Sequence, residues 1–205
     1  MDDVELIWSD TAADVHRFVV GPIDNNVFVV RCRTTGEAVL IDAANEPERL
    51  LRIAKQLGVT SVVTTHGHWD HIGAVEQVRE AGIPVWVRVE DAPLLGGYDH
   101  LLDDDAVHPA GELALRCVHT PGHTPGSITF ALEGTPLLFT GDTLFPGGPG
   151  NTTFEGGDFP TIINSIETRI FEIYGDDTIV WPGHGASSTI GVERPHLEEW
   201  VTRGW

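Results

Sequence analysis

The most constraining feature of the sequence is a histidine-rich loop between an expected strand and an expected helix. Residues 59–65 (VTSVVTT) are apolar and β-branched, as in a buried strand. Residues 72–81 carry apolar side chains at helical spacing, and Gly82 stands at the expected end of that helix. The loop therefore follows the carboxyl end of a strand, which is where α/β proteins commonly place their functional sites.

This loop carries side chains of the kinds that bind metal ions: His66, His68, Asp70 and His71. Residues two apart in an extended segment point the same way, so His66 and His68 can hold one cation. Asp70 and His71 come after the chain turns and face a second, neighbouring point. A histidine-rich surface loop is the plainer interpretation, but this spacing between a strand and a helix rarely arises by chance. The loop can thus supply ligands to two adjacent metal ions.

Other candidate ligands lie further along the chain. His123, Asp142 and His184 each come shortly after an apolar segment that is expected to form a strand. Taken alone, each position is weak, because Gly-Asp and Gly-His-Gly are more often simple turns. The repetition of one arrangement is what predicts that these side chains converge with the histidine loop.

Length and composition indicate a single domain over residues 1–205, with a sizeable core. No apolar run approaches the roughly 20 residues of a membrane helix. The acidic start, residues 1–5, lacks the basic and apolar regions of a signal peptide. Cys32 and Cys117 lie in strand-like runs, which favours reduced core thiols over a disulfide. We therefore expect a soluble cytoplasmic protein that does not associate with membranes.

The formal net charge is −19, and Lys55 is the only lysine. Such a surface repels nucleic acid unless a local basic patch overrides it, and the sequence has no run of basic residues that would form one. We expect a small-molecule substrate rather than a nucleic acid. The sequence does not indicate an oligomeric state.

The rest of the chain is expected to mix strands and helices. We expect strands at residues 17–20, 27–32, 38–41, 83–87, 113–119, 127–132, 136–140 and 178–181, and helices at 47–57, 160–174 and 195–201. Asp158 or Thr161 is a suitable cap for the second of these helices. Residues 91–110 are polar and turn-rich and are expected to connect two halves, with His100 and His108 at the surface. Periodicity alone supports an α/β class.

With its ordered motifs, the chain resembles the metallo-β-lactamase superfamily over roughly residues 15–190. The resemblance implies a four-layer αββα sandwich, with two sheets face to face, helices outside and the metals at one edge. It also implies two metal sites that share a carboxylate: one metal on His66, His68 and His123, a second on Asp70, His71 and His184, and Asp142 as the bridge. These ligands suit zinc, and also iron or manganese.

Two cations about 3.5–4 Å apart would share a hydroxide that acts as the nucleophile. Asp70 would both bind a metal and orient the attacking oxygen, so we expect it to be catalytic. Asp42 ends its strand on the same side and either orients a ligand histidine or merely caps the strand. His119 is more simply interpreted as a structural histidine.

Within the superfamily, the chain is most similar to the glyoxalase II group of hydroxyacylglutathione thioesterases. Residues 139–145 (FTGDTLF) and 154–159 (FEGGDF) carry this similarity. Asp142 argues against true β-lactamases, which lack that bridging carboxylate. The group has a basic residue where this chain has Asn151, and only about twenty residues follow His184, where the group has a helical domain.

We therefore expect a binuclear hydrolase of a small ester or thioester, with Asn151 at a substrate-binding position. A mononuclear iron persulfide dioxygenase is one alternative, because it would share His66, His123 and Asp142 as ligands. A hydrolase of a lactone or a phosphodiester is another.

Overall fold

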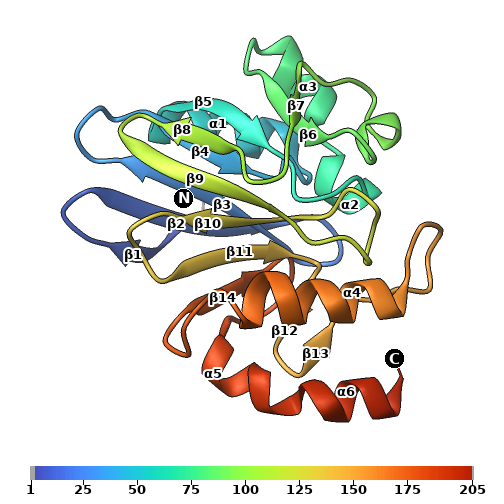
Figure 1. Cartoon of the computed structure of the whole chain (residues 1–205). Coiled ribbons are helices and arrows are strands. Elements are labelled where there is room, and N and C mark those ends of the chain that lie inside the picture. Colours follow the sequence, from blue (N-terminus) through green and yellow to red (C-terminus); the bar gives the residue numbers. More distant parts are fainter. Residues whose placement is uncertain (1–2, 205) are drawn as a thin grey trace.

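The computed structural model describes residues 3–204 and contains two β-sheets packed face to face with helices outside them (Figure 1). The domain expected over residues 1–205 also includes residues 1–2 and 205, which lie outside the described part. The two sheets and two outer helical layers form the αββα arrangement that the resemblance implies. The predicted fold class is confirmed.

The first sheet has seven strands in sequence order: β1 (Glu5–Ser9), β2 (Ala13–Val20), β3 (Asn25–Cys32), β4 (Ala38–Ile41), β5 (Val59–Val63), β6 (Val85–Arg88) and β7 (His100–Leu102). The first four are antiparallel neighbours, whereas β4 to β7 run parallel. Parallel neighbours need crossover connections, which here contain α1 (Pro47–Leu57), α2 (Trp69–Ile72) and α3 (Val75–Glu80). The carboxyl ends of β4 and β5 consequently share one edge of the sheet.

The second sheet has six strands in the order β15 (Ser188–Thr189), β14 (Ile179–Pro182), β11 (Leu137–Gly141), β10 (Ile128–Leu132), β9 (Leu113–His119) and β8 (Val107–Ala110). A short ribbon, β12 (Leu144–Phe145) with β13 (Gly148–Pro149), projects from it. Strands β11 and β14 are parallel. The segments that follow them therefore leave the sheet at the same edge.

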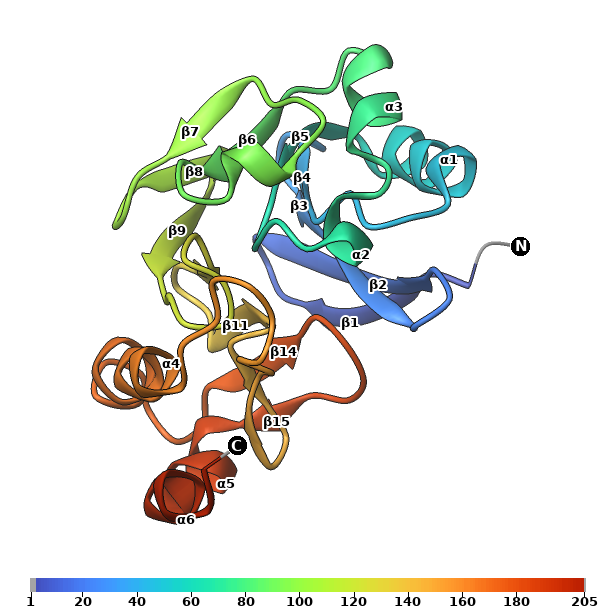
Figure 2. The ribbon, with the colours of Figure 1, turned by 90° about the vertical axis from the view of Figure 1, so that its right-hand side faces the viewer.

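The buried apolar side chains form three layers. One lies between α1, α3 and the first sheet, and one lies between the sheets. The third lies between the second sheet and the helices α4 (Phe159–Ser165), α5 (Ile190–Glu193) and α6 (Leu197–Arg203). Figure 2 shows α1 and α3 on one side of the sheets and α4 and α6 on the other. Burying each large apolar side chain contributes about 1.5–3 kcal/mol, so both outer layers are held firmly to the sheets.

The helix expected over residues 72–81 is interrupted. It begins as the short α2 and resumes as α3, with Gly73 and Ala74 between them. A Cβ built on Gly73 would lie 2.7 Å from the Ala44 carbonyl oxygen, and the Ala74 N–H donates to the Ala43 carbonyl at 2.9 Å. This contact with the segment after β4 explains the break, which periodicity could not reveal.

The C-terminal helices agree with the sequence more closely. Asp158 accepts a hydrogen bond from the Thr161 N–H at 2.9 Å, so it caps α4 as expected. A π-helix (Ile166–Phe171) continues α4, so the predicted helix is α-helical only in its first half. The helix expected at 195–201 is divided between a 3₁₀ turn (Arg194–His196) and α6.

The expected connection over residues 91–110 is more regular than predicted. It contains a 3₁₀ turn (Ala92–Leu94) and the edge strands β7 and β8. His100 is exposed, as predicted, and stacks on Trp86 with ring centroids 4.4 Å apart. The surface placement of His108 is wrong, because alternate residues of β8 point inward.

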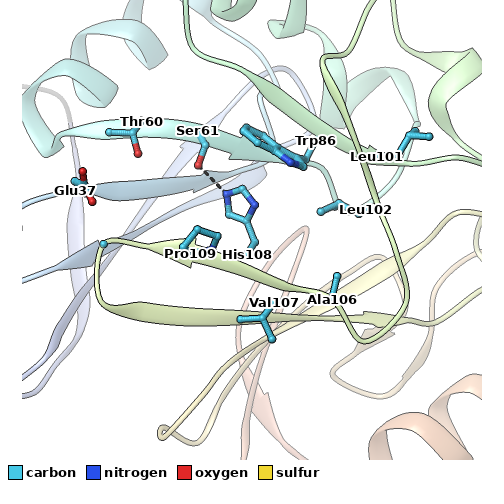
Figure 3. Close-up of a pocket in the computed structure, with 11 residues that line it drawn as sticks. Glu37, Thr60, Ser61, Trp86, Leu101, Leu102, Ala106, Val107, His108 and Pro109 are labelled. Atoms are coloured by element: carbon cyan, nitrogen blue, oxygen red, sulfur yellow. Dashed lines mark hydrogen bonds between the residues drawn. The ribbon is translucent and has the colours of Figure 1, made fainter.

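His108 lies in a hollow of about 410 Å³ between the sheets, where its Nε2 is 2.8 Å from Ser61 Oγ (Figure 3). Cys32 and Cys117 are free and buried, as expected for core thiols. Among residues 3–204, the helices are all too short or too polar to cross a bilayer.

Candidate metal centre

The seven candidate ligands converge at the shared edge of the two sheets. They come from five places: His66 and His68 from the loop after β5, Asp70 and His71 from α2, His123 from the β9–β10 loop, Asp142 from the segment after β11, and His184 from the segment after β14. The parallel pairs β4–β5 and β11–β14 place these segments together. Convergence thus follows from the topology.

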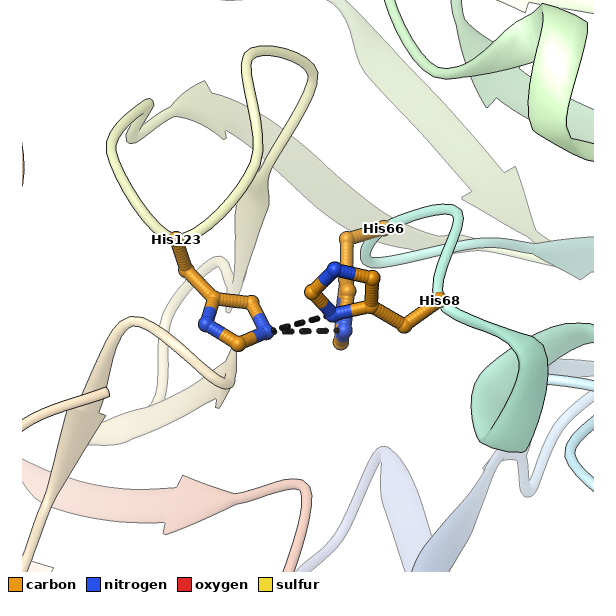
Figure 4. A group of neighbouring side chains, drawn as sticks. All are labelled: His66, His68 and His123. Atoms are coloured by element: carbon orange, nitrogen blue, oxygen red, sulfur yellow. Dashed lines mark hydrogen bonds between the residues drawn. The ribbon is translucent and has the colours of Figure 1, made fainter. Parts of the chain in front are cut away.

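Three histidines form the first group (Figure 4). His123 Nε2 lies 2.8 Å from His68 Nδ1 and 3.2 Å from His66 Nε2. The His123 ring meets the His66 and His68 rings nearly edge to face. Three nitrogens this close fit the coordination sphere of one cation, whose bonds to imidazole are about 2.0–2.1 Å long for zinc.

Asp70, His71 and His184 form the second group. Asp70 Oδ2 lies 3.2 Å from His184 Nε2 and 3.3 Å from His71 Nε2. Asp142 contacts both groups, since its Oδ1 is 3.4 Å from His71 Nε2 and its Oδ2 is 3.6 Å from His123 Nε2. This carboxylate therefore stands where a bridging ligand would stand.

In three of the histidines, Nδ1 points away from the cluster and contacts an oxygen that can only accept a hydrogen bond. The Nδ1 contacts are His71 to the Asp42 carboxylate (2.7 Å), His123 to the Asn151 carbonyl (2.6 Å) and His184 to the Ile23 carbonyl (3.0 Å). In the neutral imidazole each Nδ1 therefore carries the proton, which leaves the Nε2 lone pair aimed at the cluster.

Two atoms at the centre of the cluster have no hydrogen-bond partner among the described residues. His71 Nε2 and Asp142 Oδ1 are both buried and make no hydrogen bond there. Buried polar atoms are ordinarily satisfied, and imidazole nitrogens and carboxylate oxygens are ligands that divalent transition metals accept. The donor set fits two metal ions joined by a carboxylate.

The electrostatics of the first group favour metal binding. Burial holds the pKa of His66 well below its usual range and lowers the pKa of His68 and of His123. These imidazoles are consequently neutral near pH 7, which is the protonation state that ligates metals.

In the second group the carboxylates dominate. Burial disfavours a charged His71, but Asp142 and Asp42 outweigh it and raise the His71 pKa well above the usual range. Burial likewise opposes ionisation of Asp70, yet His184, His71 and Asn25 hold its pKa well below that of an ordinary carboxyl. A cation would take the place of the proton between these groups.

Asp42 lies against a candidate ligand, as one of the two sequence interpretations expected. Besides His71, it accepts hydrogen bonds from the Thr65 N–H and the Thr65 hydroxyl, each at 2.7 Å. It adopts a left-handed φ of 66°, a conformation that aspartate tolerates better than most residues. Asp42 therefore fixes both the start of the histidine loop and the orientation of His71.

Asp91 has a role that sequence reasoning missed. Its buried carboxylate accepts hydrogen bonds from the Gly67 N–H (2.7 Å), the Thr124 hydroxyl (2.6 Å) and the Gly126 N–H (2.7 Å). Asp91 thus ties the histidine loop to the loop that carries His123. A Cβ on Gly126 would lie 2.6 Å from Asp91 Cγ, which explains a glycine there.

Asn25 is a second residue that sequence reasoning missed, because it lies in a stretch typical of a turn. It is fully buried, and its Nδ2 donates to Asp70 Oδ2 at 2.8 Å and lies 3.3 Å from His184 Nε2. Its backbone also pairs with His184. Asn25 therefore holds Asp70 and His184 in one arrangement.

Two predicted positions turn out to act through local structure. The Asn151 carbonyl accepts from His123, and the Asn151 side chain accepts from the Thr153 N–H at 2.8 Å. Its role toward a substrate stays a prediction. His119 Nε2 lies 2.8 Å from the Pro125 carbonyl, which agrees with a structural role.

Fold and ligand arrangement together define a class of protein. The chain belongs to the metallo-beta-lactamase superfamily, whose model matches residues 20–184. Members of this superfamily are mostly metal-dependent hydrolases that hold two metal ions.

The chain is 36% identical to the hydroxyacylglutathione hydrolase GloC of Haemophilus influenzae over 179 residues, which are 77% of this chain and 84% of GloC. It also superposes on the crystal structure of the BLEG-1 B3 metallo-beta-lactamase with a TM-score of 0.82 and 32% identity, over 89% of this chain and 97% of that one. The di-iron-bound form of TTHA1623 gives a TM-score of 0.78 and 29% identity, over 87% and 96% of the two chains.

Proposed function

We propose that this protein is a binuclear metal-dependent hydrolase that acts on a small ester or thioester. The observation that carries the proposal is the pair of ligand groups joined by Asp142, with unpartnered His71 Nε2 and Asp142 Oδ1 between them. Membership of a superfamily of metal-dependent hydrolases supports it.

In this proposal each ligand group holds one ion: His66, His68 and His123 the first, Asp70, His71 and His184 the second, with Asp142 between them. Zinc suits these imidazole and carboxylate donors, and iron and manganese are the alternatives. The di-iron form of TTHA1623 keeps iron under consideration for this chain.

Two bound cations would supply a nucleophile from water near neutral pH and polarise the oxygen of the scissile group. The chain's own contribution is positioning. Asp70 stays ionised because its pKa is low, and Asn25 holds one of its oxygens at 2.8 Å. Asp70 is therefore suited to accept a hydrogen bond from the attacking water and to orient it.

The proposal does not specify which acyl group is transferred to water. The name of GloC supports a thioester. Asn151 supplies no cation for a glutathione carboxylate, which favours an uncharged substrate. The BLEG-1 name adds a β-lactam to the compounds worth testing, although the bridging aspartate leads us to expect little turnover of it.

Metal analysis with a substrate panel tests the proposal. We expect about two divalent metals per chain and hydrolysis of a simple ester or thioester above that of a lactone, a β-lactam or a phosphodiester. One iron per chain, with dioxygen uptake in the presence of glutathione persulfide, would instead identify a persulfide dioxygenase.

A further inference from the structure

Large apolar side chains are exposed beside the candidate metal centre. Trp69 is 60% exposed, Phe154 58%, Leu94 53% and Ile23 47%. Trp69 stands directly between His68 and Asp70 in the sequence. We call these four residues, with the partly buried Phe145, the apolar rim.

Two members of the rim lie on the side of the first ligand group. The Phe154 ring is 5.5 Å from the His68 ring and meets it edge to face. Leu94 packs on the histidine loop so closely that a Cβ on Gly67 would be 2.7 Å from Leu94 Cδ1. Phe154 therefore lies against a histidine of the first group, and Leu94 lies against the loop that carries two of its histidines.

Two other members lie beside the second group. The Ile23 carbonyl accepts from His184 Nδ1 at 3.0 Å, so the Ile23 residue stands against that histidine. The Phe145 ring stacks over the His184 ring at 6.5 Å. The rim consequently flanks both ligand groups.

A metal centre alone does not need such neighbours. Exposure of large apolar side chains to water is unfavourable, and a cluster of them on a surface commonly marks a binding site. Small-molecule sites combine apolar walls with a few well-placed polar groups. Here the ligand cluster supplies the polar groups, and the rim supplies apolar side chains beside it.

The charge next to the rim restricts what it can bind. Asp24 follows Ile23 and Glu155 follows Phe154, and both carboxylates are exposed. Asn151, whose carbonyl contacts His123, carries no charge. An anionic group would be repelled at these positions, whereas an uncharged chain would not.

We propose that the apolar rim binds the acyl part of the substrate, and that this acyl part is an uncharged aliphatic or aromatic chain rather than a short polar one. The inference rests on the proposed function, because it places the scissile carbonyl at the ligand cluster. Phe154 and Trp69 would determine specificity.

Hydrolysis of acyl esters of increasing length tests the inference. Burial of one methylene contributes enough to change kcat/KM about three- to fourfold, so kcat/KM should rise from acetyl to butyryl to hexanoyl esters of one alcohol. Phe154→Ala should reduce the hexanoyl-to-acetyl ratio by about five- to tenfold, because a large part of the apolar wall is lost. Ile173→Ala is the matched control, since Ile173 is 67% exposed but follows the π-helix.

Binding of the product carboxylates gives a second readout that needs no turnover. Titration calorimetry of the metal-loaded protein should show hexanoate binding tighter than acetate, and Phe154→Ala should remove most of the difference. Metal content should be the same in both proteins, which separates lost acyl binding from lost metal.

The two proposals fail in different ways. Equal kcat/KM for all chain lengths, with equal carboxylate affinities, would overturn the apolar rim and leave the hydrolase intact. No hydrolysis of any ester or thioester by protein with two metals would overturn the proposed function. Calorimetry would still show whether the apolar rim binds an acyl chain. A dimer in solution that Trp69→Ala dissociates would show that the rim is an interface between copies, and would overturn the inference.

Discussion

At the scale of single residues, the candidate site depends on which nitrogen of each histidine is free. The contacts of His71, His123 and His184 with Asp42 and two carbonyl oxygens place the proton of each neutral imidazole on Nδ1, so that the inward Nε2 can bind a metal ion. Each of these histidines therefore depends on its hydrogen-bond acceptor for the orientation that metal binding needs. Removing either should impair metal binding, because supporting partners typically change affinity 10- to 100-fold.

Substitution of one histidine from each group should abolish hydrolysis. His68→Ala and His184→Ala each remove a nitrogen that no neighbour replaces, and we expect the rate to fall by about 10³-fold or more, as for lost metal-ion catalysis. His100→Ala is the control and should stay within about twofold, because exposed sites away from special features tolerate change. Steady-state rates with metal content check this, and an equal loss in His100→Ala would contradict the ligand assignment.

At the scale of elements, periodicity and motif spacing were sufficient to predict the strands and the ligand motifs that follow them. The strands before His66 and His123 are apolar runs, and both motifs follow them. Asp91 and Asn25 were missed because their partners are distant in sequence and their neighbours look like ordinary turns. The inward face of His108 was missed because a four-residue edge strand gives too short a pattern to distinguish from a loop.

Loss of the Asp91 carboxylate should loosen the contact between two ligand loops. Asp91→Ala leaves the Gly67 and Gly126 N–H groups buried without an acceptor, which costs on the order of 3 kcal/mol of unfolding free energy. Metal affinity should fall about 10- to 100-fold. Denaturant unfolding and metal titration measure the two effects, with exposed Asp103→Ala as control. Wild-type metal affinity in Asp91→Ala would show that the loops are held by other contacts.

The buried His108 should make stability depend on pH. Burial, helped by the nearby His100, lowers the His108 pKa from 6.5 to about 4. Between these pH values the unfolded chain binds a proton that the folded chain does not, so the unfolding free energy decreases as pH falls. With 1.36 kcal/mol per pKa unit, discounted for partial solvation, we expect a loss of about 2 kcal/mol.

Unfolding of wild type and of His108→Gln at pH 7 and pH 4.5 measures this contribution. The variant should lose less stability between the two values, because carboxyl groups titrate equally in both proteins. The same pH dependence in both would mean that His108 is protonated in the folded state.

At the scale of the whole molecule, the fold concentrates candidate ligands at one edge while the surface carries a formal charge of −19. Neutralising phosphates requires clustered basic side chains, and the chain has few. We expect no measurable retention of DNA or RNA at physiological salt in a mobility-shift assay. Nuclease activity that co-purifies and disappears in His68→Ala would refute this expectation.

The same charge bears on the proposal that glutathione thioesters are poor substrates of this protein, although GloC is named for such a substrate. Such a substrate carries carboxylates, and the position where the glyoxalase II resemblance expects a cation is the neutral Asn151. A missing charge-assisted hydrogen bond costs about 1.5–3 kcal/mol, or roughly ten- to a hundredfold in binding. S-lactoylglutathione should therefore have a lower kcat/KM than an uncharged thioester of similar size.

Asn151→Lys tests this reasoning in the opposite direction. The Asn151 carbonyl that orients His123 belongs to the backbone, so the substitution keeps that contact and changes only the side chain. We expect kcat/KM for S-lactoylglutathione to rise by tenfold or more, and that for the uncharged thioester to stay nearly constant. Turnover of S-lactoylglutathione by the unmodified protein at about 10⁶ M⁻¹s⁻¹ or above would contradict the prediction, because another cation would then have to hold the glutathione carboxylate.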